Sequence, residues 1–517
     1  MRYWNEVEFQ RIGLCMSTRT DAKQSGRKWF PLTKGGAVRK WYGNNEYVVN
    51  WEDDGREMLG YAAKLYGSPT RTVKNMDFYF REGITWSTIS NRFSMRFSAA
   101  GAISETKGAM CFADSKDDLI YLLGFSNSCL VESFLKVFSP TLDFHEGPFG
   151  KLPFIKSRES DTIKSLSNEC VSLARADWDN FETSWDFRDQ PLLRPGLKGA
   201  TLEASWRNWE AHCTAAIRQM QELETENNRL FIAAYGLEGE LSPEVPEEQI
   251  TLARADQRKD VAAFLSYAVG CMMGRYSLDA EGLICADAGD TVADYLRIVN
   301  EKWGELPEDE DSGITWDEIA FPPDEDAIIP VLEGEWFVDD IVARTRDFLR
   351  VTFGEATLKE NLRFIEDSLG KSLEKYFLTD FYKDHLQTYK KRPIYWLFQS
   401  PKRGFSALVY LHRYTKDTVN TLLNRYLRDY LKKLESRIAH LTQVEATANT
   451  TKEKTAARKE REKLEKALKD CQDWERDVIL PLAQQRLEID LDDGVKVNYL
   501  KFEGGVAKIP GLAAKED

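Results

Sequence analysis

The chain has 517 residues, of which 42% are hydrophobic and 30% charged, and its net charge is −14. This length allows about three globular domains. The longest apolar run, residues 261–274, is too short to cross a bilayer, and no signal-peptide pattern opens the chain. Eight scattered cysteines without a CxxC pair and only five histidines give no support to a zinc site, and they predict reduced thiols in a cytoplasm.

The negative charge is unevenly distributed along the sequence. Residues 1–155 hold 20 basic and 17 acidic residues, so the acidic excess lies entirely in the rest of the chain. Residues 301–340 hold 15 acidic residues and one basic residue, Lys302. We therefore expect contacts with DNA phosphates in the first segment or on local basic faces. The acidic segment is expected to face away from DNA or toward a basic partner.

Residues 1–156 predict a β-rich domain. Between Arg27 and Gly55, aromatic residues are mixed with lysines and arginines around glycine and asparagine turn signals, and residues 46–51 alternate like a strand. Cations bind phosphates and flat rings stack on bases, so this stretch can form a nucleic-acid surface. A β core with buried rings and solvated cations explains the same pattern, and chemistry alone favours that second interpretation.

Residues 157–240 change to helical spacing and predict a helical spacer. Residues 241–416 predict a mixed, mainly helical domain that contains an acidic loop over 301–340. Near its end, two apolar runs predict buried strands joined by a basic turn at Lys402 and Arg403. These two cations could meet a phosphate, although a solvated turn is the commoner explanation.

Residues 417–486 carry leucines and aromatic residues at three- and four-residue spacing, interrupted by a short polar stretch. This pattern predicts an antiparallel helical hairpin of coiled-coil type. Residues 487–517 predict a tail with a short strand over 495–502. The whole sequence therefore predicts an α+β fold that is mostly helical beyond an N-terminal β-rich domain.

Four stretches carry a family resemblance. They are residues 28–55 (KWFPLTKGGAVRKWYGNN and onward), 66–90 (YGSPTRTVKNMDFYF and onward), 266–283 (SYAVGCMMGRYSLDAEGL) and 391–414 (KRPIYWLFQSPKRGFSALVYLHRY). In this order they resemble the target-recognition and C-terminal regions of PglX, the adenine-specific DNA methyltransferase family of BREX phage-defence systems. The chain resembles a PglX that lacks its catalytic front half. The resemblance implies N6-adenine methylation with S-adenosylmethionine by the full-length family, and a role in distinguishing self from phage DNA.

The resemblance also implies that residues 1–156 form a target-recognition domain that reads a short DNA site. Lysine and arginine would contact phosphates and base edges, and an asparagine can bond an adenine edge through two hydrogen bonds. Trp29, Trp51 and Trp86 are assigned to the core. The candidate DNA contacts in this domain are Arg27, Lys28, Lys34, Arg39, Lys40, Trp41, Tyr42, Asn44 and Asn45.

The motifs of adenine methylation are missing from the sequence. Such an enzyme needs a glycine-rich turn for S-adenosylmethionine and an Asn/Asp-Pro-Pro-aromatic loop that holds the flipped base. The one Pro-Pro pair, Pro322 and Pro323, lies between Phe321 and Asp324, which are the wrong neighbours. No catalytic, cofactor-binding or metal-binding residues are predicted, and whether the isolated chain is an enzyme stays open.

The leading hypothesis is a DNA target-recognition and assembly portion of a BREX-type N6-adenine methyltransferase, not catalytic by itself. Its expected partners are double-stranded DNA, a separately encoded catalytic half and other BREX proteins; a truncated product is the other explanation of the missing half. The alternative function is a protein-interaction scaffold for BREX components, with DNA contact secondary. DNA affinity that falls steeply with salt would favour the first hypothesis, and salt-insensitive protein binding the second.

Overall fold

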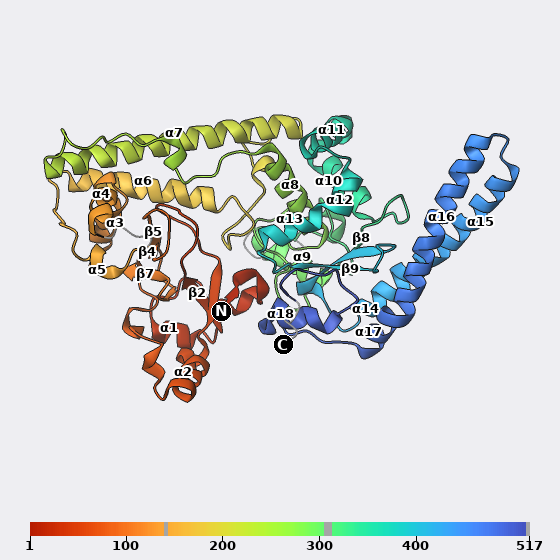
Figure 1. Ribbon diagram of the computed structural model, residues 1–517, viewed down its shortest axis with the longest axis horizontal. Helices are drawn as coiled ribbons and strands as arrows, with labels where there is room; N and C mark the ends of the chain where they lie inside the picture. Colours follow the sequence, from red (N-terminus) through yellow and green to blue (C-terminus); the bar gives the residue numbers. More distant parts are fainter. Residues whose placement is uncertain (139–142, 304–312, 513–517) are drawn as a thin grey trace. The chain divides into compact units, whose positions relative to one another are not determined.

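The computed structural model describes residues 1–138, 143–303 and 313–512 (Figure 1). The chain divides into two compact units, each made of several stretches of sequence. Unit 1 comprises Met1–Trp4, Phe9–Pro191 and Trp206–Ala255, and unit 2 comprises Asn5–Glu8, Leu192–Ser205 and Asp256–Asp517. The mixture of small sheets and many helices confirms the predicted α+β class. The finer five-part division of the sequence stays a prediction.

Unit 1 contains two small sheets. Its strands are β1 (Arg2–Tyr3), β2 (Trp29–Thr33), β3 (Tyr47–Asn50), β4 (Gly83–Ser87), β5 (Met95–Ser98), β6 (Ile103–Ser104) and β7 (Gly108–Cys111). The first sheet has the order β1-β3-β2-β6, with only the β2–β6 pair parallel, and the second has the antiparallel order β5-β4-β7. The core assignment of Trp29, Trp51 and Trp86 is confirmed, since all three are buried.

Helices cover the second sheet of unit 1. The helices of this unit are α1 (Arg19–Gln24), α2 (Glu52–Tyr66), α3 (Lys116–Ser126), α4 (Cys129–Phe138), α5 (Glu146–Phe149), α6 (Ser160–Trp178) and most of α7 (Leu202–Tyr235). Figure 1 shows α6 and α7 lying alongside one another, as the helical spacing of residues 157–240 predicts. The buried side-chain amide of Asn227 in α7 donates to the carbonyl of Gly124 in α3 at 3.0 Å, and this hydrogen bond connects α7 with α3.

Unit 2 surrounds one antiparallel sheet with helices. Its elements are α8 (Gln257–Met272), α9 (Val292–Trp303), β8 (Ile328–Pro330), α10 (Ile341–Phe353), α11 (Leu358–Leu369), α12 (Leu373–Thr379), α13 (Phe381–Thr388), β9 (Tyr395–Gln399), β10 (Ser406–Tyr410), α14 (Thr418–Thr421), α15 (Arg428–Thr447), α16 (Thr451–Trp474), α17 (Leu480–Gln485) and α18 (Val495–Asn498). The sheet order is β8-β10-β9, so the predicted strand pair around the basic turn forms as an antiparallel hairpin.

The predicted helical hairpin of residues 417–486 is present as α15 and α16. A polar link of three residues joins them, and Thr450 begins α16 with a capping box, its hydroxyl accepting from the amide of Glu453. Arg461 of α16 reaches Glu445 of α15 at 3.1 Å, which fixes the two helices across the seam. Figure 1 shows this hairpin standing out from the rest of unit 2.

The predicted acidic loop over residues 301–340 is only partly described. Residues 304–312 lie outside the described residues. In the part that follows, Glu325 and Asp326 pair with Arg425, and Glu333 pairs with Lys463 at 2.6 Å. These carboxylates therefore contact cations of their own unit.

The predicted strand over residues 495–502 is wrong. These residues form α18 and a 3₁₀ turn, Tyr499–Phe502. Val495, Tyr499 and Phe502 are buried while Val497 is 50% exposed, which is the spacing of a helix rather than the alternation of a strand. The tail still reaches the sheet further on, because the amide of Ala507 donates to the carbonyl of Leu397 in β9 at 2.8 Å.

Residues 5–8 belong to unit 2, although the whole stretch that follows, Phe9–Pro191, belongs to unit 1. The carboxylate of Glu6 is buried there and accepts from the amide of Val495 at 3.3 Å. It also lies 3.8 Å from the guanidinium of Arg392. Unit 2 is thus completed by a segment nearly 500 residues away in sequence, since these two bonded residues are 489 positions apart.

Candidate functional site

The candidate cations at the start of the aromatic-basic stretch lie on or near the surface of unit 1. Arg27 is exposed, and Lys28 is partly buried with its ammonium 5.7 Å from the ring centroid of Trp29. Lys34 holds its ammonium 4.6 Å above the ring of Tyr47 in β3. Cations held over ring faces keep their charge and part of their hydration. These three side chains remain candidate phosphate contacts.

Arg39 is engaged within unit 1. Its guanidinium pairs with Asp177 of α6 at 2.5 Å and lies 5.0 Å from the ring centroid of Trp178. Gly43 makes this stacking possible: a Cβ at this position would come within 2.9 Å of both the Arg39 Nε and the Trp178 ring, and its φ is +123°. With its side chain only 15% exposed, Arg39 connects the β region to α6.

Lys40 and Trp41 converge on one buried carboxylate. Lys40 Nζ lies 2.6 Å from Glu224 Oε2 of α7, and Trp41 Nε1 donates to the other oxygen of Glu224 at 2.8 Å. The Lys40 and Glu224 side chains are 6% and 2% exposed, and Trp41 is 1% exposed. The backbone amide of Lys40 also donates to the hydroxyl of Thr251. This group therefore holds the β region on the helices.

These contacts correct part of the predicted DNA surface. Lys40, Trp41 and Tyr42 are buried, so none of them presents a side chain to a ligand in this structure. Burial also raises the pKa of Tyr42 to about 12, which keeps its hydroxyl neutral. The cause of the error is long-range pairing: a lysine can be buried when a carboxylate neutralises it, and Glu224 lies 184 residues away.

The two candidate asparagines lie in the turn that follows. Asn44 adopts φ +61°, and its amide donates to the carbonyl of Ala37 at 2.9 Å. Asn45 is partly exposed and lies beside Tyr42. The Asn44 side chain supports the turn itself, and contact of either asparagine with a base stays a prediction.

An exposed aromatic-basic cluster that the sequence reasoning missed lies near the second sheet of unit 1. We call it the Phe78 cluster, and it consists of Phe78, Arg81 and Phe112. The Arg81 guanidinium lies 5.3 and 5.5 Å from the ring centroids of Phe78 and Phe112, and those two rings are 5.0 Å apart. A separate contact places the Lys116 ammonium 5.7 Å from the Phe97 ring.

The Phe78 cluster combines ring faces and a cation at an accessible surface. Phe78 is 41% exposed, and Arg81 is exposed. Arg81 takes part in no ion pair within the described residues. The signal in the sequence was the run of three aromatic residues before Arg81, which reads as strand alternation. The structure instead forms a 3₁₀ turn, Met76–Phe78, which leaves Phe78 outside and buries the two rings that follow.

Lys402 and Arg403 lie on the exposed turn between β9 and β10 in unit 2. The turn wraps around the carboxylate of Asp470 from α16, which accepts from the amides of Lys402 and Gly404 and from the hydroxyl of Ser400 at 2.6 to 3.1 Å. The backbone donors of this turn are therefore already satisfied by a carboxylate of the same unit. Only the two side chains remain for a ligand, and a phosphate contact stays a prediction.

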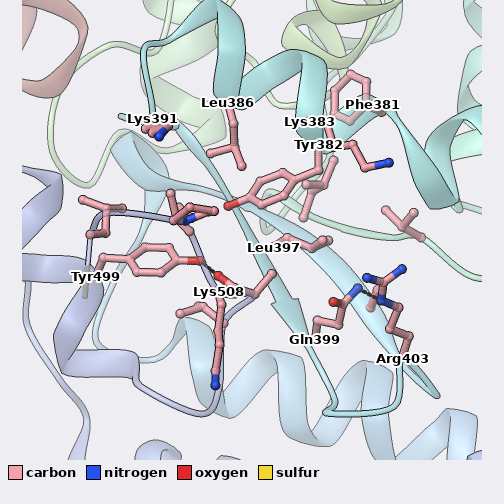
Figure 2. Close-up of a pocket in the computed structure, with 18 of the residues that line it drawn as sticks. Phe381, Tyr382, Lys383, Leu386, Lys391, Leu397, Gln399, Arg403, Tyr499 and Lys508 are labelled. Atoms are coloured by element: carbon pink, nitrogen blue, oxygen red, sulfur yellow. Dashed lines mark hydrogen bonds between the residues drawn. The ribbon is translucent and has the colours of Figure 1, made fainter. Parts of the chain in front are cut away.

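A pocket with a cavity volume of about 1420 Å³ lies on the sheet of unit 2 (Figure 2). Its floor is formed by Leu397 of β9 and its partner Leu408 of β10. Beside them, Gln399 donates to the Ser406 hydroxyl at 3.0 Å. Helix α13 and residues 499–512 of the tail form its walls.

Cations stand around this pocket. The described residues that line it include the acidic residue Glu503 and the basic residues Lys383, Lys390, Lys391, Arg403 and Lys508. Figure 2 shows Lys383, Lys391, Arg403 and Lys508 at separate positions around the opening, with Leu386 and Leu397 between them. The pocket is thus apolar inside and positively charged at its rim.

Two carboxyl groups of unit 2 have strongly raised pKa values, which is one signature of catalytic acids. Burial raises the pKa of Asp290 to about 6, and burial together with Asp324 raises the pKa of Asp326 to about 7. Both have structural partners: Asp290 accepts from the amide of Asp287, and Asp326 accepts from the hydroxyl of Tyr426.

Residues 1–138, 143–303 and 313–512 contain no candidate metal centre and no candidate membrane span. No cluster of three or more histidine, cysteine, aspartate or glutamate side chains in these ranges could hold a metal ion. No helix in the same ranges is both long enough and apolar enough to span a bilayer.

Comparison with known proteins identifies two relatives across nearly the whole chain. The chain is 37% identical over 518 residues to the adenine-specific methyltransferase PglX of Lacticaseibacillus casei (strain Zhang), which covers 97% of this chain and 41% of that protein. It is 34% identical over 545 residues to the adenine-specific methyltransferase BrxX of Escherichia coli O9:H4 (strain HS), which covers 99% of this chain and 42% of that protein. No protein-family model matches the chain. The chain spans about two fifths of the length of these relatives, and it is a partial homologue of the PglX and BrxX adenine-specific methyltransferases.

Proposed function

We propose that this chain is the DNA target-recognition and assembly portion of a BREX-type, site-specific N6-adenine DNA methyltransferase. The observation that carries the proposal is the identity of 34–37% over almost the entire chain to two adenine-specific methyltransferases. The sequence contains neither the cofactor turn nor the Asn/Asp-Pro-Pro-aromatic loop of methyl transfer. In the proposal, methyl transfer from S-adenosylmethionine is carried out by residues outside this sequence, and the modification separates self from phage DNA.

Unit 1 is the proposed DNA-binding unit. Its support is the pairing of accessible cations with ring faces, at Lys34 over Tyr47 and at Arg81 over Phe78 and Phe112. Cations contact phosphates, and an exposed ring can stack on a base or a sugar. Residues 1–155, which contain these cations, hold 20 basic and 17 acidic residues, although the rest of unit 1 is acidic.

The test is electrophoretic binding of the purified chain to short duplexes over a salt series. The informative variants are Arg27→Gln/Lys34→Gln and Arg81→Gln, because these side chains are accessible and hold no buried partner. Each lost phosphate contact should reduce the salt slope of log K by about 1 and weaken binding across all sequences. The change Arg39→Ala/Lys40→Ala is unsuitable, since it breaks two internal ion pairs.

The matched control is Lys466→Gln/Lys469→Gln, which removes two exposed cations from α16. The control should bind DNA as the unchanged chain does. A folded chain that shows no salt-dependent binding at low salt would contradict the proposed recognition role, as would variants in unit 1 that bind no more weakly than the control.

A further inference from the structure

The pocket of unit 2 offers a site outside unit 1, the proposed DNA-binding unit, and it shares Arg403 with the predicted phosphate contacts of the β9–β10 turn. Cavities that hold small ligands are commonly about 300–1,000 Å³, and this one measures about 1420 Å³. The pocket extends along the sheet from the β9–β10 turn to α13, and it opens to solvent at its rim. A single small molecule would leave much of this space unfilled, whereas a short segment of polypeptide would occupy it.

The rim has uncompensated positive charge. Lys383 pairs with Asp380 at 3.2 Å, while Lys390, Lys391, Arg403 and Lys508 take part in no ion pair within the described residues. The acidic residue of the lining, Glu503, is exposed. An occupant that places carboxylates at the rim would therefore gain charge complementarity without displacing an internal partner.

The interior favours aliphatic contacts over base stacking. Phe377, Phe381 and Tyr499 are at most 5% exposed, so their faces are covered by neighbouring side chains, and Tyr382 is a partly exposed ring of the lining. Leu386 is partly exposed, and Leu500 is 38% exposed. Nucleic acid would need free ring faces, whereas the apolar anchors of a protein segment need accessible leucines.

We propose that this pocket docks a peptide segment of a partner protein, with aliphatic residues inserted between Leu386 and Leu500 and acidic residues facing Lys391, Arg403 and Lys508. The segment is of the amphipathic, acidic type that lies in a groove on its apolar side. This proposal rests on the assembly role proposed above, and it does not depend on DNA binding by unit 1. Either activity can therefore fail in its own assay without the other.

The probe is a fluorescein-labelled amphipathic Leu/Glu peptide of about 12 residues, ~18 Å long as a helix. Fluorescence anisotropy with the full chain measures its Kd. Comparison peptides of equal length replace Glu by Lys, or Leu by Ser, and a thymidine oligonucleotide of matched charge serves as competitor. The Leu/Glu peptide should bind most tightly, because it alone satisfies both the rim and the interior.

The variants separate the two contributions. Lys391→Glu/Arg403→Glu removes rim charge, Leu386→Gln removes an apolar contact, and each should weaken binding about tenfold. The control Lys466→Glu/Lys469→Glu makes the same charge change on α16 and should leave Kd unchanged. All changed side chains are exposed or partly exposed, so folding is preserved and circular dichroism verifies it.

Two results would overturn the proposal. One is a Leu/Glu peptide whose Kd is no lower than that of the Ser/Glu or Leu/Lys peptide, or whose Kd does not change in the pocket variants. The other is displacement of the peptide by the oligonucleotide at equal concentration, which would make the pocket a nucleic-acid groove.

Discussion

The ion pair between Lys40 and Glu224 should be a principal support of unit 1. Lys40→Met leaves the Glu224 carboxylate buried with Trp41 as its remaining side-chain donor. Removing one partner of a buried pair typically costs about 3–5 kcal/mol, and the retained indole bond places this case near the lower end. For a unit of this size, each kcal/mol lowers Tm by about 2–4 °C, so we expect a drop of about 6–12 °C.

Neutralising the carboxylate should recover most of this loss. In Lys40→Met/Glu224→Gln the glutamine oxygen still accepts from Trp41, and no unpaired carboxylate is left at this site. The double variant should therefore be more stable than Lys40→Met alone, with a coupling of about 2 kcal/mol in the mutant cycle. Arg229→Met is the control, because the Arg229–Glu226 pair lies on the surface of α7 and its loss should hardly change Tm.

Calorimetry measures Tm, and hydrogen exchange of peptides covering residues 39–45 and 220–228 localises the effect. The expected result is faster exchange at both places in Lys40→Met and slower exchange again in the double variant. A Tm change below about 2 °C in Lys40→Met, or a double variant no more stable than the sum of its single changes, would refute the reasoning.

Two further predictions concern unit 2. Burial and, to a smaller extent, the charge of Arg275 lower the pKa of His385 and of His412 to about 3. Below about pH 6.5 the unfolded chain therefore binds protons on these histidines that the folded chain does not bind. As the pH is lowered from this value, the free energy of unfolding should decrease by up to about 1.4 kcal/mol per pH unit for each histidine. Urea unfolding from pH 7 to pH 4 measures this slope, and His385→Gln should make it shallower; an unchanged slope would refute the assignment. Asp470→Asn should destabilise unit 2 by about 2 kcal/mol, since hydrogen bonds to a charged group are worth about 1.5–3 kcal/mol. The control Asp473→Asn changes a half-exposed residue of the same helix and should hardly change the free energy of unfolding in the same urea titration. Equal effects of the two changes would contradict the stabilising role of Asp470 in the β9–β10 turn.

Local patterns predicted the regular parts of the fold. The leucine spacing predicted α15 and α16, and the apolar runs predicted β9 and β10, because each pattern depends on which side chains are buried within one element. Both predictions are confirmed. The strand prediction for the tail was wrong because Val495 and Val497 fit the alternation of a strand over a few residues. Only the burial of Tyr499 and Phe502 identifies the helical period.

The candidate site was harder to predict, because exposure depends on partners far away in sequence. Lys40 and Arg39 look like phosphate ligands until Glu224 and Asp177 are brought beside them by α7 and α6. The accessible Arg81 is absent from the predicted contacts, because the sequence does not show that Phe78 beside it is exposed while Tyr79 and Phe80 are buried. Composition located a basic aromatic region in the first 155 residues, but the fold decides which of its side chains reach solvent.

The bond between Glu6 and Val495 has a consequence for synthesis of the chain. Residues 5–8 leave the ribosome well before the amide that Glu6 accepts from, which is made 489 residues later. At about 5–20 residues per second, this interval is about 25–100 s. During that time unit 1 can be translated completely and fold, since its last residue is Ala255, but unit 2 cannot. A ribosome that stalls before residue 495 should therefore release a chain with a finished first unit and a second unit whose N-terminal segment has no binding site.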